Sequence, residues 1–157
     1  MITYVGAQWR RFFGLNISRV EPLLFVGGQF RAEQWPLLRA LGVRAVLSMQ
    51  AERPDSFAGE PPERALRLLV PDFTPPTLAQ LAEGVTFIEE AHGAGQPVFV
   101  HCHAGVGRAP IMAAAYLVAS RRIGHLEALD HVRRARPIIG PSPAQVARLR
   151  EFERQAR

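Results

Sequence analysis

The sequence predicts an α/β fold in which a central, mostly parallel sheet of four or five strands is flanked by helices. Short apolar runs rich in β-branched residues alternate along the chain with stretches of helical periodicity. These runs are apolar on both faces, which is typical of strands at the centre of a parallel sheet covered by helices. Because the chain has 157 residues, 48% of them hydrophobic and 21% charged, we expect one domain over residues 1–157.

Strand and helix signals alternate through the first two thirds of the chain. Strands are expected at residues 23–26, 43–49, 66–70 and 98–100. A helix over residues 32–41 is expected to end with Gly42 as its C-cap. A second helix is expected to run from Thr77, which pairs with Gln80 in a capping box, to about His92.

Proline-rich segments interrupt these elements, and helices follow them. Residues 50–64 can only form a loop, and residues 71–76 exclude regular structure. The remaining helices are expected at residues 108–121, at residues 126–135 and from Pro143 onward, with Ser142 as N-cap and Gln145 at the third position. Since such folds bind ligands outside the carboxyl ends of their strands, we expect the functional site there.

The basic residues are unusual in kind and in distribution. All 19 are arginine, against 14 acidic residues, and residues 121–157 account for the whole net charge of +5. This excess favours an anionic partner, although arginine near helix C-termini also complements the helix dipole. Because no aromatic stacking platform or known binding motif accompanies the arginines, we expect no nucleic-acid partner.

Several classes of protein are excluded on composition. The longest weakly polar stretch, residues 111–119, is about half the roughly 20 residues needed to cross a bilayer, so we expect no integral membrane segment. Residues 1–13 lack the pattern of a secretory signal, and residues 9–13, although compatible with an anionic membrane surface, are expected to pack on their own domain. Cys102 is the only cysteine and no two histidines have ligand spacing, so we expect a reduced thiol, a cytoplasmic location, no metal and no cofactor.

The segment from His101 to Arg108 carries the chemistry. A strand runs directly into His-Cys-His-Ala-Gly-Val-Gly-Arg and then into a helix. Such a loop places several backbone N–H groups around one point, where the helix dipole also favours negative charge. We expect it to bind phosphate, or an oxyanion such as sulfate or vanadate, through His103, Ala104, Gly105, Val106, Gly107 and Arg108.

The same segment holds a nucleophile, and an acid follows another strand. Cys102 enters the loop, where these donors would stabilise its thiolate. A thiolate below a phosphate site indicates phosphoryl transfer through a phosphocysteine intermediate, which requires an acid for the leaving group. Asp72 is the acid in the proline-rich loop upstream, so we expect Cys102, Arg108 and Asp72 to be catalytic. His101 is expected to orient the loop, and Gln145 to cap its helix rather than to position water.

These residues resemble the cysteine-dependent protein phosphatases, specifically the small atypical dual-specificity group. Residues 102–108 fit its Cys-x5-Arg signature, Pro71-Asp72-Phe73 is similar to its general-acid loop, and Arg136-Pro137 stands where the group often has Arg-Pro. The resemblance covers residues 23–152. It implies a dual-specificity phosphatase-like fold and hydrolysis of phosphotyrosine and phosphoserine or phosphothreonine monoesters.

The resemblance leaves the substrate open. Residues 72–78 with Gly84-Val85, and residues 18–20, are similar to phosphatidylglycerophosphate phosphatases, so a phospholipid phosphate monoester is the alternative to a phosphorylated protein. His103, however, stands where lipid-type members often carry Lys. In the family a Ser or Thr usually follows the loop arginine, and its hydroxyl helps the sulfur leave the phosphocysteine. Ala109 stands at this position here, so we expect slow turnover. The same alanine allows a third hypothesis, a catalytically weak phosphate-binding module.

Overall fold

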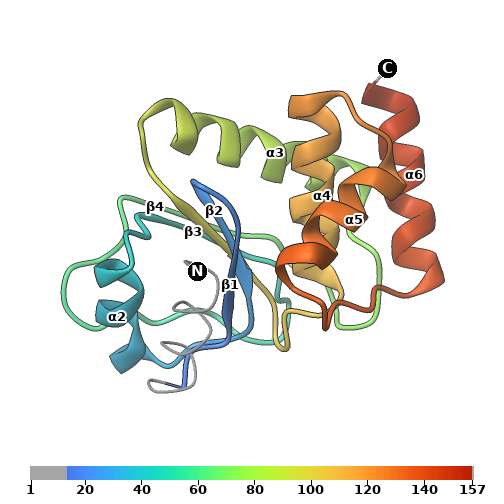
Figure 1. Cartoon of the computed structure of the whole chain (residues 1–157). Helices are drawn as coiled ribbons and strands as arrows, with labels where there is room; N and C mark the ends of the chain where they lie inside the picture. The colour runs from blue at the N-terminus through green and yellow to red at the C-terminus, as the bar shows by residue number, and fades with distance from the viewer. Residues whose placement is uncertain (1–13, 157) are drawn as a thin grey trace.

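The computed structural model describes residues 14–156 and contains one five-stranded sheet, as predicted (Figure 1). Its strands are β1 (Ile17–Glu21), β2 (Leu24–Gly27), β3 (Ala45–Ser48), β4 (Arg64–Arg67) and β5 (Val98–His101). Their order across the sheet is β1-β2-β5-β3-β4. All neighbouring strands run parallel except β1 and β2, so the sheet is mostly parallel.

Helices cover both faces of the sheet. The short helix η1 (Ala32–Gln34) continues into α2 (Trp35–Ala40), and both lie on one face over a cluster that includes Trp35, Val46 and Phe99. The larger core lies on the other face, beneath α3 (Leu78–Gly93), α4 (Arg108–Arg121), α5 (His125–Ala135) and α6 (Pro143–Ala156). Helix α4 is buried along most of its length because α3, α5 and α6 surround it.

Two strands differ from the sequence prediction. Strand β1 was not predicted, because only Ile17 and Val20 of its five residues are buried and no long apolar run marks it. Strand β4 begins at Arg64 and ends at Arg67, whereas the prediction placed it at residues 66–70. β4 is an edge strand with an alternating burial pattern, so the apolar run over residues 66–70 only partly coincides with its pairing.

The residues predicted to cap the helices do so in the structure. The Thr77 hydroxyl accepts from Gln80 N at 3.0 Å, and Gln80 Oε1 accepts from Thr77 N at 2.9 Å. Ser142 and Gln145 form the same pair of bonds, at 3.2 and 2.8 Å. Gly42 follows α2 with a φ of 105°, as expected for a glycine that ends a helix.

The predictions for residues 1–13, including the segment 9–13, concern residues outside the described part of the chain. Among the helices of residues 14–156, none is both long and apolar enough to span a bilayer.

Candidate active site

Three adjacent parallel strands deliver the candidate residues to one edge of the sheet. Cys102 follows β5, Glu52 follows β3 and Asp72 follows β4. Since the carboxyl ends of parallel strands lie at the same edge, the predicted nucleophile and acid come together although 30 residues separate them in sequence. We call residues 102–108 the cysteine loop and residues 71–77 the acid loop.

The backbone of the cysteine loop has its carbonyl groups turned outward. Each carbonyl accepts a hydrogen bond from outside the loop. Gln29 N donates to His103 O (2.9 Å), Asn16 Nδ2 to Ala104 O (2.9 Å), Arg136 Nε to Gly105 O (2.7 Å), Gly140 N to Val106 O (2.9 Å) and Ile111 N to Gly107 O (3.2 Å). The N–H of a peptide unit points opposite to its C=O, so the following amides face the interior of the loop. Within residues 14–156 the amides of residues 104–108 have no protein acceptor, an arrangement that suits an anion.

Arg136 and Gly105 hold this conformation in place. Arg136 is 1% exposed and donates to Gly105 O and Ala104 O, at 2.7 and 3.0 Å. Gly105 has a φ of 73°, and a Cβ there would lie 2.5 Å from Arg136 Nη2. Because a side chain would be strained and would also collide with the arginine, this position requires glycine.

Cys102 lies at the base of the loop, with 2% of its surface exposed. Its amide donates to Gly27 O at 3.3 Å, which ties it to the end of β2. The next two residues, His103 and Ala104, are exposed. The residue after Arg108 is Ala109, which is fully buried and brings no hydroxyl to the base of the loop.

Arg108 is 1% exposed and is held by Glu52, a residue that sequence reasoning did not single out. Its Nη1 and Nη2 donate to the two carboxylate oxygens of Glu52 at 2.7 and 2.8 Å. Nη1 also donates to Val70 O at 2.8 Å. The buried Nε has no partner within residues 14–156 and is therefore a donor available to an anion.

The electrostatics of this pair favour full ionisation. Burial opposes the charge of Arg108, but the hydrogen bonds to Glu52 and the charges of Cys102, Asp72 and Glu52 raise its pKa overall. In turn, the hydrogen bonds from Arg108 lower the pKa of Glu52 to about 2, against the opposing effect of burial. Arg108 therefore stays cationic at the edge of the loop.

Asp72 reaches the site from the acid loop. Its Oδ1 lies 3.2 Å from Arg108 Nη2, and its side chain is 45% exposed, so it has access to both the loop and solvent. Thr74 N donates to Pro71 O, which closes a turn with Phe73 at its third position. Phe73 has a φ of 64° and is 84% exposed. The structure thus brings Cys102, Arg108 and Asp72 together, as the sequence predicted.

His101 ends β5 directly before the cysteine loop, and its role in orienting that loop stays a prediction. Its ring is fully buried between Phe30 and Phe99, with ring centroids 5.3 and 5.4 Å away. Its Nε2 lies 2.8 Å from Asp55 Oδ2. Asp55, like Glu52, belongs to the loop between β3 and β4, so this one loop fixes two residues of the site.

Glu52 could have been found from the argument that found Asp72, because it is the first acid after the carboxyl end of a parallel strand. Asp55 and Asn16 carry no such signal. In the sequence, Arg136 is marked only as part of an Arg-Pro pair. Its hydrogen bonds to the cysteine loop follow from the tertiary structure alone.

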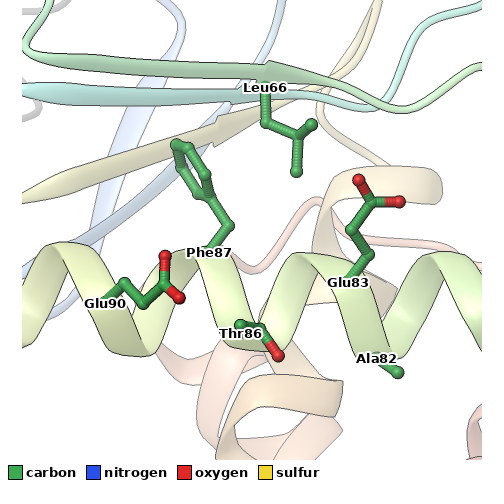
Figure 2. Close-up of a pocket in the computed structure, with 6 residues that line it drawn as sticks. All are labelled: Leu66, Ala82, Glu83, Thr86, Phe87 and Glu90. Carbon is green, nitrogen blue, oxygen red and sulfur yellow. The ribbon is translucent and has the colours of Figure 1, made fainter.

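A separate hollow of about 460 Å³ lies between β4 and α3. Figure 2 shows Leu66 and Phe87 facing one another across it, with Glu83 and Glu90 beside them on α3. It shares no residue with the cysteine loop or the acid loop, and its polar side chains are Glu83, Thr86 and Glu90.

Comparison with known proteins places this arrangement in one class. The sequence profile described as "Dual specificity phosphatase, catalytic domain" matches residues 24–155. The chain therefore belongs to the dual-specificity phosphatase family, which confirms the resemblance drawn from the sequence.

Individual relatives agree with this assignment. Human dual specificity protein phosphatase 1 is 32% identical over 137 residues, which cover 87% of this chain but 37% of the relative. Human dual specificity protein phosphatase 2 is 34% identical over the same length, and 43% of it is covered. The chain thus spans well under half the length of these relatives.

Two solved structures are similar over most of their length. The crystal structure of PTPMT1 in complex with PI(5)P has a TM-score of 0.80 at 29% identity, covering 89% of this chain and 96% of that one. Human DUSP28 has a TM-score of 0.80 at 28% identity, with coverage of 89% and 94%. The predicted dual-specificity phosphatase-like fold is therefore confirmed.

Proposed function

We propose that this protein hydrolyses phosphotyrosine and phosphoserine or phosphothreonine monoesters through a phosphocysteine intermediate. The observation that carries the proposal is the set of inward-facing amides of the cysteine loop, with the Cys102 sulfur at their base. Arg108 Nε, buried and without a protein partner in the described chain, adds a charged donor at the same place. This donor set suits the equatorial oxygens of a phosphoryl group, and sulfate or vanadate would bind in the same way.

In the first step the Cys102 thiolate attacks phosphorus, and the bond from phosphorus to the ester oxygen breaks. The amides and Arg108 stabilise the charge on the equatorial oxygens. Asp72, protonated in this step, gives its proton to the departing oxygen, so that an alcohol or a phenol leaves. Its position 3.2 Å from Arg108 Nη2 supports this role, because that atom borders the phosphate site.

In the second step water attacks the phosphocysteine. Asp72, now a carboxylate, takes a proton from the water, the S–P bond breaks and the thiolate returns. Inorganic phosphate leaves with all four oxygens, one of them from water. Because the cycle needs a free thiol, we propose a reducing, cytoplasmic setting.

Family membership and charge support a phosphorylated protein as the substrate. The excess of arginine in residues 121–157 would attract acidic sequences around a phosphorylated residue. The likeness to PTPMT1, solved with PI(5)P, supports a phospholipid monoester as the second candidate.

The experiment compares steady hydrolysis of a phosphotyrosine peptide, a phosphoserine peptide and phosphatidylglycerophosphate in one buffer. We expect hydrolysis of the peptides at the higher kcat/KM, inhibition by vanadate, and loss of activity in Cys102→Ser. A preference for the lipid would select the second candidate. Absence of hydrolysis of every ester, with phosphate still bound, would leave a binding module instead of an enzyme.

A further inference from the structure

Helix α6 holds the acid loop by two side chains. Gln145 Nε2 donates to Thr74 O at 3.2 Å, and Arg148 Nη1 donates to Pro76 O at 2.6 Å. The two donors are three residues apart, so they lie on one face of the helix. The two acceptors are alternate carbonyls of the acid loop, directly downstream of Asp72.

The acid loop depends on such external donors. Pro75 and Pro76 have no N–H group and exclude helix or sheet pairing in this stretch. Their neighbouring carbonyls still need hydrogen-bond partners where they are shielded from solvent. Side chains of α6 donate to two of these carbonyls, so a helix far away in sequence contacts the loop.

Gln145 does more than its capping role requires. In a capping box the side-chain oxygen at the third position bonds the N-cap amide, and Gln145 Oε1 does so with Ser142 N at 2.8 Å. Its Nε2 is free for the bond to Thr74. The same side chain is 3% exposed and packs on the cysteine loop, since a Cβ on Gly107 would lie 2.8 Å from its Oε1.

We propose that Gln145 and Arg148 form a latch that holds the acid loop, and with it Asp72, over the cysteine loop. Both are positioning residues, because they act through Asp72 and do not touch the reacting atoms. The inference rests on the proposed function, in which Asp72 protonates the leaving group.

The latch should matter most for esters with poor leaving groups. A p-nitrophenolate leaves with little help from an acid, whereas the phenolate of phenyl phosphate, like that of phosphotyrosine, needs a proton. Displacing Asp72 therefore lowers kcat/KM more for phenyl phosphate than for p-nitrophenyl phosphate. The readout is the ratio of the two values, which does not depend on the folded fraction because both esters are measured on one preparation.

Four single variants separate the latch from the cap and from net charge. Gln145→Glu keeps the capping box, in which Glu serves as well as Gln, but removes the donor to Thr74. Arg148→Met removes the donor to Pro76. Ser142→Ala is the control for the cap, because it keeps the Gln145 amide. Arg150→Met is the control for charge, because Arg150 is exposed on the same helix.

We expect Gln145→Glu and Arg148→Met each to raise the ratio of kcat/KM for p-nitrophenyl phosphate to kcat/KM for phenyl phosphate by about fivefold or more. This increase is part of the contribution of the general acid to catalysis. Arg148→Lys, which retains a donor, should restore most of the wild-type ratio. Both control variants should keep that ratio. In an Asp72→Asn background the latch variants should add nothing, since the group they position is gone.

The outcomes distinguish this inference from the proposed function. If Asp72→Asn raises the ratio but neither latch variant does, the latch is wrong and the acid assignment stands. If Ser142→Ala raises the ratio as much as Gln145→Glu, Gln145 is only a cap and the latch is wrong. If Asp72→Asn leaves the ratio unchanged, Asp72 is not the acid, and the proposed mechanism and the latch fail together.

Discussion

In the proposed function, the Arg108 guanidinium serves both the protein and the anion. Glu52 holds the edge formed by Nη1 and Nη2, at 2.7 and 2.8 Å. In the proposed function Nε, which has no partner within residues 14–156, donates to phosphate, and Asp72 Oδ1 lies 3.2 Å from Nη2 on the same side. The sequence predicts that Arg108 binds phosphate, and the structure indicates which of its N–H groups are available, because the others are already engaged by a carboxylate.

At the same scale, Ala109 should limit turnover. A hydroxyl at this buried position would donate to the Cys102 thiolate as it leaves the phosphocysteine. We expect Ala109→Ser to raise the steady-state rate about tenfold, the equivalent of one hydrogen bond to a charged group. The wild type should show a burst of p-nitrophenol followed by slow turnover in stopped-flow measurements. A wild type without a burst, or a serine variant with the same steady rate, would show that breakdown of the intermediate is not limiting.

At the scale of elements, the loop between β3 and β4 stabilises the site through charge. The pKa of Glu52 is lowered from 4.5 to about 2 by its bonds from Arg108. Because the folded protein binds this proton more weakly than the unfolded chain does, the stabilisation is complete above pH 4.5 and is lost as the pH falls toward 2.

We therefore expect Glu52→Gln to lower the free energy of unfolding by about 1 kcal/mol at pH 7, a value reduced by solvent screening of the half-exposed carboxylate. The difference between wild type and variant should shrink as the pH falls from 4.5 toward 2. Urea unfolding at a series of pH values measures it. Glu60→Gln, an exposed carboxylate of the same loop, is the control and should change little. A difference that does not depend on pH would contradict the ion pair.

Packing between α3 and α4 depends on a glycine within α3. A Cβ on Gly84 would lie 2.8 Å from Met112 Cε and 3.4 Å from Leu47 Cδ2, in a fully buried region. We expect Gly84→Ala to destabilise the protein by about 1 to 3 kcal/mol despite the gain in helix propensity. Gly93, at the end of the same helix, has no atom within 4 Å of such a Cβ, so Gly93→Ala should not destabilise. Thermal unfolding of the pair tests this, and equal effects would refute the packing argument.

Helix ends that depend on neighbouring residues were predictable from the sequence. The capping boxes at Thr77 and Ser142 and the start and end of α4 were placed correctly, because they depend on neighbouring residues. Strand β1 and the ends of β4 were not, because pairing partners decide edge strands. The site shows the same division: Cys102, Arg108 and Asp72 follow from pattern, whereas Asp55 and Asn16 contact the site only through the fold.

At the scale of the whole molecule, the parallel sheet explains why residues distant in sequence form one site. Strands β5, β3 and β4 are adjacent, and the segments that follow them bring the nucleophile, the carboxylate that holds Arg108, and the acid to one edge (Figure 1). Helix α6 closes this edge from the far end of the chain. The chain as a whole carries a net charge of +5, which favours an anionic partner.

In the proposed mechanism the sulfur of Cys102 becomes covalently bonded to phosphorus. The direct measurement is rapid quenching of the enzyme during turnover of p-nitrophenyl phosphate, followed by mass spectrometry of its peptides. We expect one added phosphoryl group on the peptide that contains Cys102, its appearance at the rate of the burst, and no such adduct in Cys102→Ser. Sustained hydrolysis by Cys102→Ser, or turnover with the phosphoryl group on another residue, would contradict it.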